Sequence, residues 1–131
     1  VMHRNTYINS KKLLNKGYQL IKKPNIFFAG QMTGVEGYVE SASSGLIAGI
    51  NMARFLEGKD ILDLDATTAI GALANYISYH AEIEQPDTFE PMNVNFGIFN
   101  ALERKVYKKE RKMAYAKRAL ENLNKILDEA K

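Results

Sequence analysis

The feature of this sequence that most constrains its fold is a cluster of three glycines, Gly30, Gly34 and Gly37, between a short apolar run and a long helical pattern. The apolar run at 26–29 follows Pro24 and predicts a buried strand. Glycines let the backbone approach a ligand closely, and the N-terminus of a helix offers unpaired N–H donors. The spacing is not the G-x-G-x-x-G dinucleotide fingerprint, so spacing alone favours a strand–helix junction of purely structural purpose.

A long helix is predicted to begin near Glu36, with Gly58 as its C-cap. Its apolar residues recur at three- and four-residue steps: Val39, Ala42, Leu46, Ile50 and Ala53. Beside them stand four small residues at four-residue spacing: Ser41, Gly45, Gly49 and Ala53. Because each helical glycine costs roughly 1 kcal/mol relative to alanine, we expect another backbone or a ligand to approach this helix closely.

Two further helices are expected. Asp63 or Asp65 can cap the first, which should reach about Tyr79. The second should run from about Leu102 nearly to the end of the chain, beyond a loop at 86–97. Its apolar seam is Leu102, Val106, Met113, Ala116, Leu120, Leu123, Leu127 and Ala130. Residues 1–23 are expected to be irregular or briefly extended.

The composition excludes several kinds of chemistry. The 131 residues contain no cysteine, which rules out disulfides, cysteine–zinc sites and thiol nucleophiles within this segment. Two distant histidines give no metal-ligand spacing. There is no apolar run of membrane-spanning length, and the first residues read like the middle of a longer protein.

Positive charge gathers near the C-terminus although the net charge is only +3. Between 104 and 118 there are eight lysines and arginines and one acid, Glu110, with Tyr107 and Tyr115 interleaved. Phosphates bind such cations, and unpaired bases stack on aromatic rings. A solvated helix face is the alternative interpretation, although eight cations against one anion is lopsided for it.

Four blocks of the sequence resemble signatures of the TrmFO family, the folate- and FAD-dependent tRNA uridine-5-methyltransferases related to the MnmG (GidA) flavoproteins. The longest block is FFAGQMTGVEGYVESA at 27–42. The others are MHRNTYINS at 2–10, TAIGAL at 68–73 and PMNVNFG at 91–97. The blocks occur in the family's order and span about three quarters of the chain.

The resemblance implies a fold that is mostly α with a few short strands, the C-terminal fragment of a Rossmann-like α/β FAD-binding protein. Residues 1–58 would end the FAD-binding domain, and residues 59–131 would form a helical C-terminal extension with a basic helix. The family's catalytic cysteines and its first dinucleotide loop lie upstream. We therefore expect no catalytic residue in this segment and no activity from the chain alone.

The resemblance also implies the chemistry of the intact protein. Family members form 5-methyluridine in the tRNA T-loop, with methylenetetrahydrofolate as carbon donor, FAD as the reduced cofactor and NAD(P)H as the source of electrons. A cytoplasmic location and tRNA as partner follow. Two alternatives stay open: the same chemistry on ribosomal RNA, and a cofactor-free helical RNA-binding module.

Carried onto this sequence, the resemblance assigns cofactor binding to one continuous run of residues. Gly30 and Gln31 would lie beside the ribityl–phosphate part of the flavin, with Thr33 next to them. The backbone of Gly34, Val35, Glu36 and Gly37 would meet the isoalloxazine ring. Tyr38 would form an aromatic wall of the flavin–folate pocket, or else be a half-buried tyrosine that closes the start of the helix. Glu36 and Glu40 are better explained as carboxylates that meet the helix dipole than as acid–base groups.

Further residues are candidates for binding the other substrates. His3, Arg4 and Asn5 could hold the folate glutamate tail or an RNA phosphate. Lys105, Lys108, Arg111 and Lys112 are the candidates for RNA contact, which the family's substrate favours. The missing N-terminal part of the polypeptide is a further expected partner, because the 26–29 strand would pair with its strands. In isolation that strand could pair with a second copy of the chain.

Overall fold

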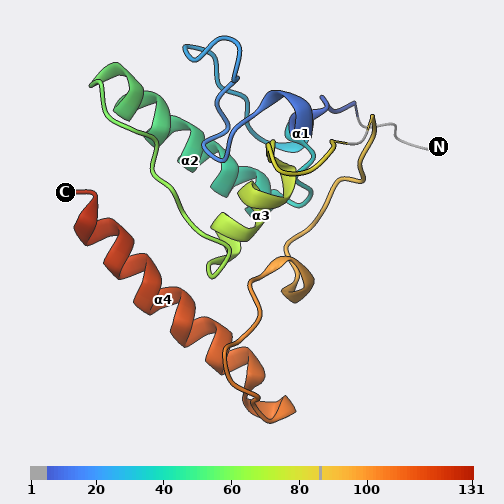
Figure 1. Ribbon diagram of the computed structural model, residues 1–131, viewed down its shortest axis with the longest axis vertical. Helices are drawn as coiled ribbons and strands as arrows, with labels where there is room; N and C mark the ends of the chain where they lie inside the picture. Colours follow the sequence, from blue (N-terminus) through green and yellow to red (C-terminus); the bar gives the residue numbers. More distant parts are fainter. Residues whose placement is uncertain (1–5, 86) are drawn as a thin grey trace.

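The computed structural model describes residues 6–85 and 87–131. In this part of the chain the α-helices are α1 (Ser10–Leu13), α2 (Tyr38–Leu56), α3 (Ala69–Ile77) and α4 (Arg111–Glu129). Short 3-10 helices occur at Gln31–Thr33 (η1), Phe96–Ile98 (η2) and Lys108–Glu110 (η3). Figure 1 shows α1, α2 and α3 gathered together, with α4 beside them at the end of a long irregular connection. The mostly helical fold class is confirmed.

The predicted strand at 26–29 is reduced to a single antiparallel bridge between Gln19 and Phe27. Leu20 N donates to the Ile26 carbonyl at 2.9 Å, and Phe28 N donates to the Tyr18 carbonyl at 3.0 Å. Both bonds lie on the edge of the 26–29 segment that faces residues 18–20. On its other edge, the N–H of Phe27 has no backbone partner among the described residues. The strand prediction is wrong for this chain because an extended segment needs a longer neighbour to form a ladder.

Helix α2 has the predicted length but buries an unexpected face. It begins after Gly37 and ends at Leu56, with Glu57 as its C-cap, so the predicted C-cap is one residue too late. Gly58 follows at φ +73°, and its N donates to the Phe55 carbonyl. The expected apolar face is wrong, because Val39 and Leu46 are exposed. The buried residues are Ser44, Ile47, Ala48 and Asn51.

Two polar side chains explain why the buried face of α2 was not recognised. Gly30 N donates to Ser44 Oγ at 2.7 Å, and Leu62 N donates to Asn51 Oδ1 at 2.6 Å. A buried polar group is tolerated when it is hydrogen-bonded, and here each one fastens a neighbouring loop to the helix. The apolar pattern of α2 therefore belongs to the side that this chain leaves exposed.

Helix α3 is shorter than predicted, and its cap is Thr68 in place of an aspartate. Gly71 N donates to Thr68 Oγ1 at 2.9 Å, which satisfies one of the free N–H groups of the first turn. Leu73 and Ile77 face inward as predicted. They join a core whose other members come from the N-terminal loops, α2, the connection between α2 and α3, α3 itself and the 86–97 loop: Leu14, Tyr18, Val35, Ile47, Ala48, Leu62, Leu64, Ala74 and Phe89.

Helix α4 begins at Arg111, nine residues later than predicted from Leu102. Cations at 104, 105, 108 and 109 would repel one another at four-residue spacing, and cations are unfavourable at a helix N-terminus. The preceding segment is instead fixed by Arg118, whose Nη1 donates to the Ala101 carbonyl at 2.7 Å and whose Nη2 donates to the Asn100 carbonyl at 2.5 Å.

The apolar residues of α4 are divided between two sides. Leu123, Ile126 and Ala130 pack against the core. Met113 is 72% exposed and Leu120 63%, so this part of the predicted inward seam is wrong. The inner face includes polar Asn122, whose Nδ2 donates to Thr67 Oγ1 at 3.0 Å. None of the described helices has the length and apolar character needed to cross a membrane.

The contrast between two helical glycines provides a test of this packing. A Cβ at Gly71 would lie 1.9 Å from the Asp65 carbonyl oxygen, whereas a Cβ at Gly49 would meet nothing within 4 Å. We expect Gly71→Ala to lower the free energy of unfolding by at least about 1–3 kcal/mol. Gly49→Ala should raise it by about 0.5–1 kcal/mol, because alanine is the better helix former. Urea denaturation of the 131-residue chain measures both. A loss of stability in Gly49→Ala would mean that the small-residue side of α2 is covered, contrary to the structure.

Candidate functional site

The glycine turn between 30 and 37 has a backbone that only glycine adopts easily. Gly30, Gly34 and Gly37 have φ values of +78°, +93° and +101°. Thr33 closes the turn, since its N and its Oγ1 both donate to the Gly30 carbonyl, at 2.9 and 2.7 Å. Gly34 N donates to the Gln31 carbonyl at 3.0 Å. Side chains with a Cβ are strained at such φ angles, which explains the three glycines.

The turn is paired with the block at 91–97. Val35 and Met92 form a parallel bridge, in which Met92 N donates to the Gly34 carbonyl and Glu36 N donates to the Met92 carbonyl, both at 2.9 Å. Asn93 Nδ2 also donates to the Glu36 carbonyl at 2.9 Å. Two of the four sequence blocks are therefore joined by backbone bonds across more than fifty residues of chain.

Glu40, in the first turn of α2, adds a side-chain bond to the same junction. Its Oε1 accepts a hydrogen bond from Val94 N at 3.3 Å. Its carboxyl group also fills the space beside Gly37, where an added Cβ would lie 2.2 Å from Oε2. The carboxylate thus positions the 92–95 segment, a role that helix-dipole reasoning alone does not predict.

The block at 2–10 reaches the turn from the other side. Ile8 N donates to the Met32 carbonyl at 2.8 Å, and Ser10 Oγ donates to the Thr33 carbonyl. Tyr7 OH donates to the Phe89 carbonyl at 2.6 Å. The candidates His3, Arg4 and Asn5 lie outside the described residues.

An aromatic cluster fills the space beneath the turn. Phe89 packs edge-on against Tyr7 and Tyr76, with ring centroids 5.4 and 6.3 Å away. An added Cβ at Gly34 would lie 2.6 Å from the Phe89 ring, so the turn rests directly on this side chain. Phe89 was not identified from the sequence, because nothing in the loop at 86–97 distinguishes it from Phe96 in the same loop.

Two lysines hold the α1 region to this cluster. The Lys11 ammonium lies 4.2 Å from the centre of the Tyr76 ring, and burial lowers the pKa of Lys11. Lys12 Nζ donates to Asp87 Oδ1 at 2.6 Å, and this hydrogen bond holds the pKa of the Asp87 carboxyl below its usual value. The cation–ring contact fastens α1 to α3, and the ion pair fastens it to the 86–97 loop.

The predicted cofactor residues differ in exposure. Thr33, Gly34 and Val35 are buried, backbone as well as side chain, so they support the turn from within and do not reach its surface. Gly30 and Glu36 are partly exposed. Gln31 and Gly37 are exposed, and Tyr38 is 98% exposed. The half-buried alternative for Tyr38 is therefore wrong in this chain.

The free side of the turn can accept an electron-rich ligand. Gly30 has nothing within 4 Å of where its Cβ would be, and no side chain caps the N-terminus of α2. The first N–H groups of a helix, together with its dipole, favour phosphates and carbonyl oxygens. These features fit the phosphate and ring carbonyls of a flavin.

One long side of α2 is uncharged and exposed. Tyr38, Leu46 and Leu56 are all more than half exposed, and Gly45 and Gly49 lie between them with open space around them. An exposed apolar surface of this length marks an interaction site. We call it the outer face of α2.

The RNA-contact candidates lie together at the start of α4. Lys108 is in η3, Arg111 and Lys112 are in the first turn of α4, and Lys105 precedes them in the irregular segment; all four are exposed. No acid in the described part forms an ion pair with them.

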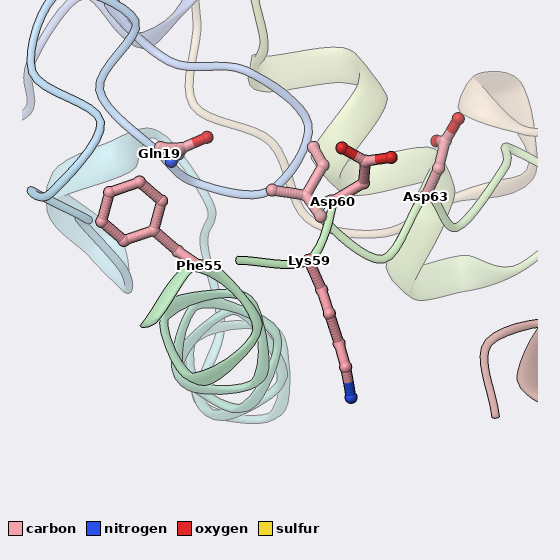
Figure 2. Close-up of a pocket in the computed structure, with 6 residues that line it drawn as sticks. Gln19, Phe55, Lys59, Asp60 and Asp63 are labelled. Carbon is pink, nitrogen blue, oxygen red and sulfur yellow. The ribbon is translucent and has the colours of Figure 1, made fainter. Parts of the chain in front are cut away.

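Other groups of polar residues do not form a site. The hollow of about 500 Å³ beside Phe55 has polar groups that diverge: Figure 2 shows Lys59 pointing away from Asp60 and Asp63. His80, as expected of a structural residue, bonds through Nε2 to the Asn75 carbonyl at 2.8 Å. Nowhere in the described ranges do three or more His, Asp or Glu side chains gather as metal ligands.

Comparison with known proteins defines the class to which this site belongs. Residues 1–60, which include the glycine turn and α2, match the model of the family described as glucose inhibited division protein A.

Relatives that match nearly the whole chain identify a more specific family of proteins. Proteins named methylenetetrahydrofolate–tRNA-(uracil-5-)-methyltransferase TrmFO are 53% identical in Natranaerobius thermophilus, 55% in Bacillus cytotoxicus and 54% in Bacillus cereus. Each match covers 98% of this chain and 29% of the relative. The chain therefore belongs to the TrmFO family and spans less than a third of the length of these relatives.

Two glycines of the turn provide a test of its packing. Gly30→Ala adds a Cβ in open space, so its cost should be only the strain of a backbone with φ +78° and ψ −162°, about 1–3 kcal/mol. Gly34→Ala should cost about 1–3 kcal/mol more, because the Cβ also meets Phe89. Chemical denaturation of both variants gives the difference. Equal losses would show that Phe89 does not support the turn.

Proposed function

We propose that the chain is the C-terminal part of an enzyme that methylates carbon 5 of a uridine in the tRNA T-loop. The carbon donor would be methylenetetrahydrofolate. The observation that carries the proposal is the convergence of separate sequence blocks on one glycine turn: Ile8 and Ser10 on one side of it, Met92 and Asn93 on the other. The names of the relatives support the substrate and the donor.

FAD is the cofactor that the turn would hold. The open space at Gly30 and the uncapped N-terminus of α2 support contacts from the turn to the flavin. Tyr38, fully accessible at the start of α2, would flank the ring system. When bound and reduced, with NAD(P)H as the source of electrons, the flavin would supply the reducing equivalents that convert the transferred carbon to a methyl group.

Residues 1–58 would complete an FAD-binding domain whose larger part lies elsewhere in the polypeptide. Two observations support this. The outer face of α2 is apolar and uncovered, and the N–H of Phe27 is left without a backbone partner on the free edge of 26–29. A strand added at that edge would pair with 26–29 and cover apolar surface at the same time. Residues 59–131 would form the helical extension.

The remaining roles belong to the same proposal. His3, Arg4 and Asn5 would bind folate or RNA. Lys105, Lys108, Arg111 and Lys112 would contact tRNA phosphates, since cations that form no ion pair are free to bind RNA. The enzyme would work in the cytoplasm, where tRNA is modified.

The chain alone should bind FAD weakly or not at all. Only the flavin-facing turn is present, and the adenosine and pyrophosphate contacts would lie on the missing part. Fluorescence titration of the 131-residue chain with FAD measures this, with an intact TrmFO relative as the positive control. A sub-micromolar dissociation constant for the chain would contradict the proposed division. The flavin absorbance of the longer protein distinguishes an enzyme from a cofactor-free RNA-binding module, and mapping the modified uridine distinguishes tRNA from ribosomal RNA.

Replacing Lys105, Lys108, Arg111 and Lys112 with glutamine should weaken RNA binding without changing stability, because glutamine is also a good helix former. The slope of log affinity against log salt should flatten by about 0.7–0.9 units for each lost phosphate contact. The control variant replaces four other exposed lysines, Lys22, Lys23, Lys125 and Lys131, and so removes the same charge. If both variants bind RNA alike across a salt series, Lys105, Lys108, Arg111 and Lys112 form only a solvated surface.

A further inference from the structure

A groove of about 840 Å³ lies between the irregular segment at 100–107 and the first half of α4. Its floor includes Arg118, which is held by the carbonyls of Asn100 and Ala101, and Asn122, which is held by Thr67. These polar bonds hold Arg118 and Asn122 in place, while the other charged side chains that line the groove are exposed.

The lining of the groove is mixed in charge, in contrast to the basic residues beside it. The cations are Arg104, Lys105, Lys117 and Arg118, and the acids are Glu103, Glu110 and Glu121. Three carboxylates make the groove itself a poor channel for phosphates. They are good acceptors for the N–H groups on the edge of a nucleobase, and the cations can donate to base carbonyls and ring nitrogens.

One aromatic ring at the groove is free to stack. Tyr107 lines the groove and is 80% exposed. The ring of Tyr115 already packs against other side chains. Its centroid lies 4.9 Å from that of Phe96 and 5.6 Å from that of Phe99, and the Arg118 guanidinium carbon lies 5.3 Å from it. The structure thus separates the two tyrosines that the sequence grouped together, and leaves Tyr107 as the stacking surface.

We propose that Tyr107 and this groove receive an unpaired RNA base, while Lys105 and Lys108 on either side of Tyr107 hold the adjoining phosphates. The inference rests on the proposed function, in which the start of α4 meets RNA, and it adds which residues receive an unpaired base. Bases within an A-form duplex are stacked and paired, so neither their faces nor their hydrogen-bonding edges reach such a groove. An unpaired base offers both to Tyr107 and to the carboxylates.

The test compares Tyr107→Leu with Tyr107→Phe, using two RNA probes: a stem-loop, and the same stem as a blunt duplex. Stacking of one base on an aromatic ring is worth a factor of about 5 to 100 in affinity. Tyr107→Leu should therefore lose about that much affinity for the stem-loop, with an unchanged salt slope and an unchanged affinity for the duplex. Tyr107→Phe keeps the ring and should bind the stem-loop like the unaltered chain. Because Tyr107 is exposed, both variants should keep the original denaturation midpoint.

The possible results separate this inference from the proposed function. Unaltered stem-loop binding in Tyr107→Leu, or an equal loss on stem-loop and duplex, overturns the base site and leaves the phosphate contacts standing. If the quadruple glutamine variant and its charge-matched control show the same RNA affinity at every salt concentration, the proposal that these basic residues contact RNA is overturned instead. If the unaltered chain binds neither RNA probe, both are overturned.

Discussion

The contact on which the site depends is the seating of the Gly34 backbone on the Phe89 ring. A left-handed glycine brings the turn so close to the ring that no other residue would fit between them. The 86–97 loop carries Phe89 and continues into Met92, which bonds to both neighbours of Val35. The same loop therefore supplies both the ring that packs below the turn and the backbone hydrogen bonds beside it. Tyr7 and Tyr76 hold that loop through its carbonyls, at Phe89 and Glu90 respectively. The shape of the turn is thus set by segments distant in sequence, and its own residues contribute mainly the freedom to adopt that shape.

Helix α2 joins two kinds of surface. Toward the core, Ser44 Oγ and Asn51 Oδ1 accept hydrogen bonds from the backbone N–H groups of Gly30 and Leu62, and Ile47 adds an apolar contact. Toward the outside it presents the uncharged outer face, which an isolated chain leaves in water. A helix normally buries its more apolar side. The inversion has a simple physical explanation if the larger apolar contact is made by the part of the polypeptide that lies beyond this chain.

The sequence predicted the helices more reliably than their orientation. The glycine turn, the end of α2 just before Gly58 and the inward side of α3 were predictable because they depend on local backbone chemistry and on simple periodicity. The buried sides of α2 and α4 were not, because Asn51 and Asn122 are polar residues whose partners, Leu62 and Thr67, become neighbours only after folding. The prediction of a strand at 26–29 was wrong for a related reason, since a ladder of hydrogen bonds also requires a second extended segment beside the first. The resemblance to a known family located the candidate site, but the support that Phe89 gives it required the three-dimensional structure.

Arg118 gives α4 an attachment of an unusual kind. Its guanidinium bonds to the backbone carbonyls of Asn100 and Ala101, and any residue at those two positions would present the same oxygens. The placement of the helix is therefore insensitive to the identity of the side chains that precede it. Substitutions at the exposed positions 103, 104, 105 and 107 leave these two bonds in place. In evolutionary terms, related proteins could retune which nucleotides they prefer along this strip while inheriting an unchanged scaffold.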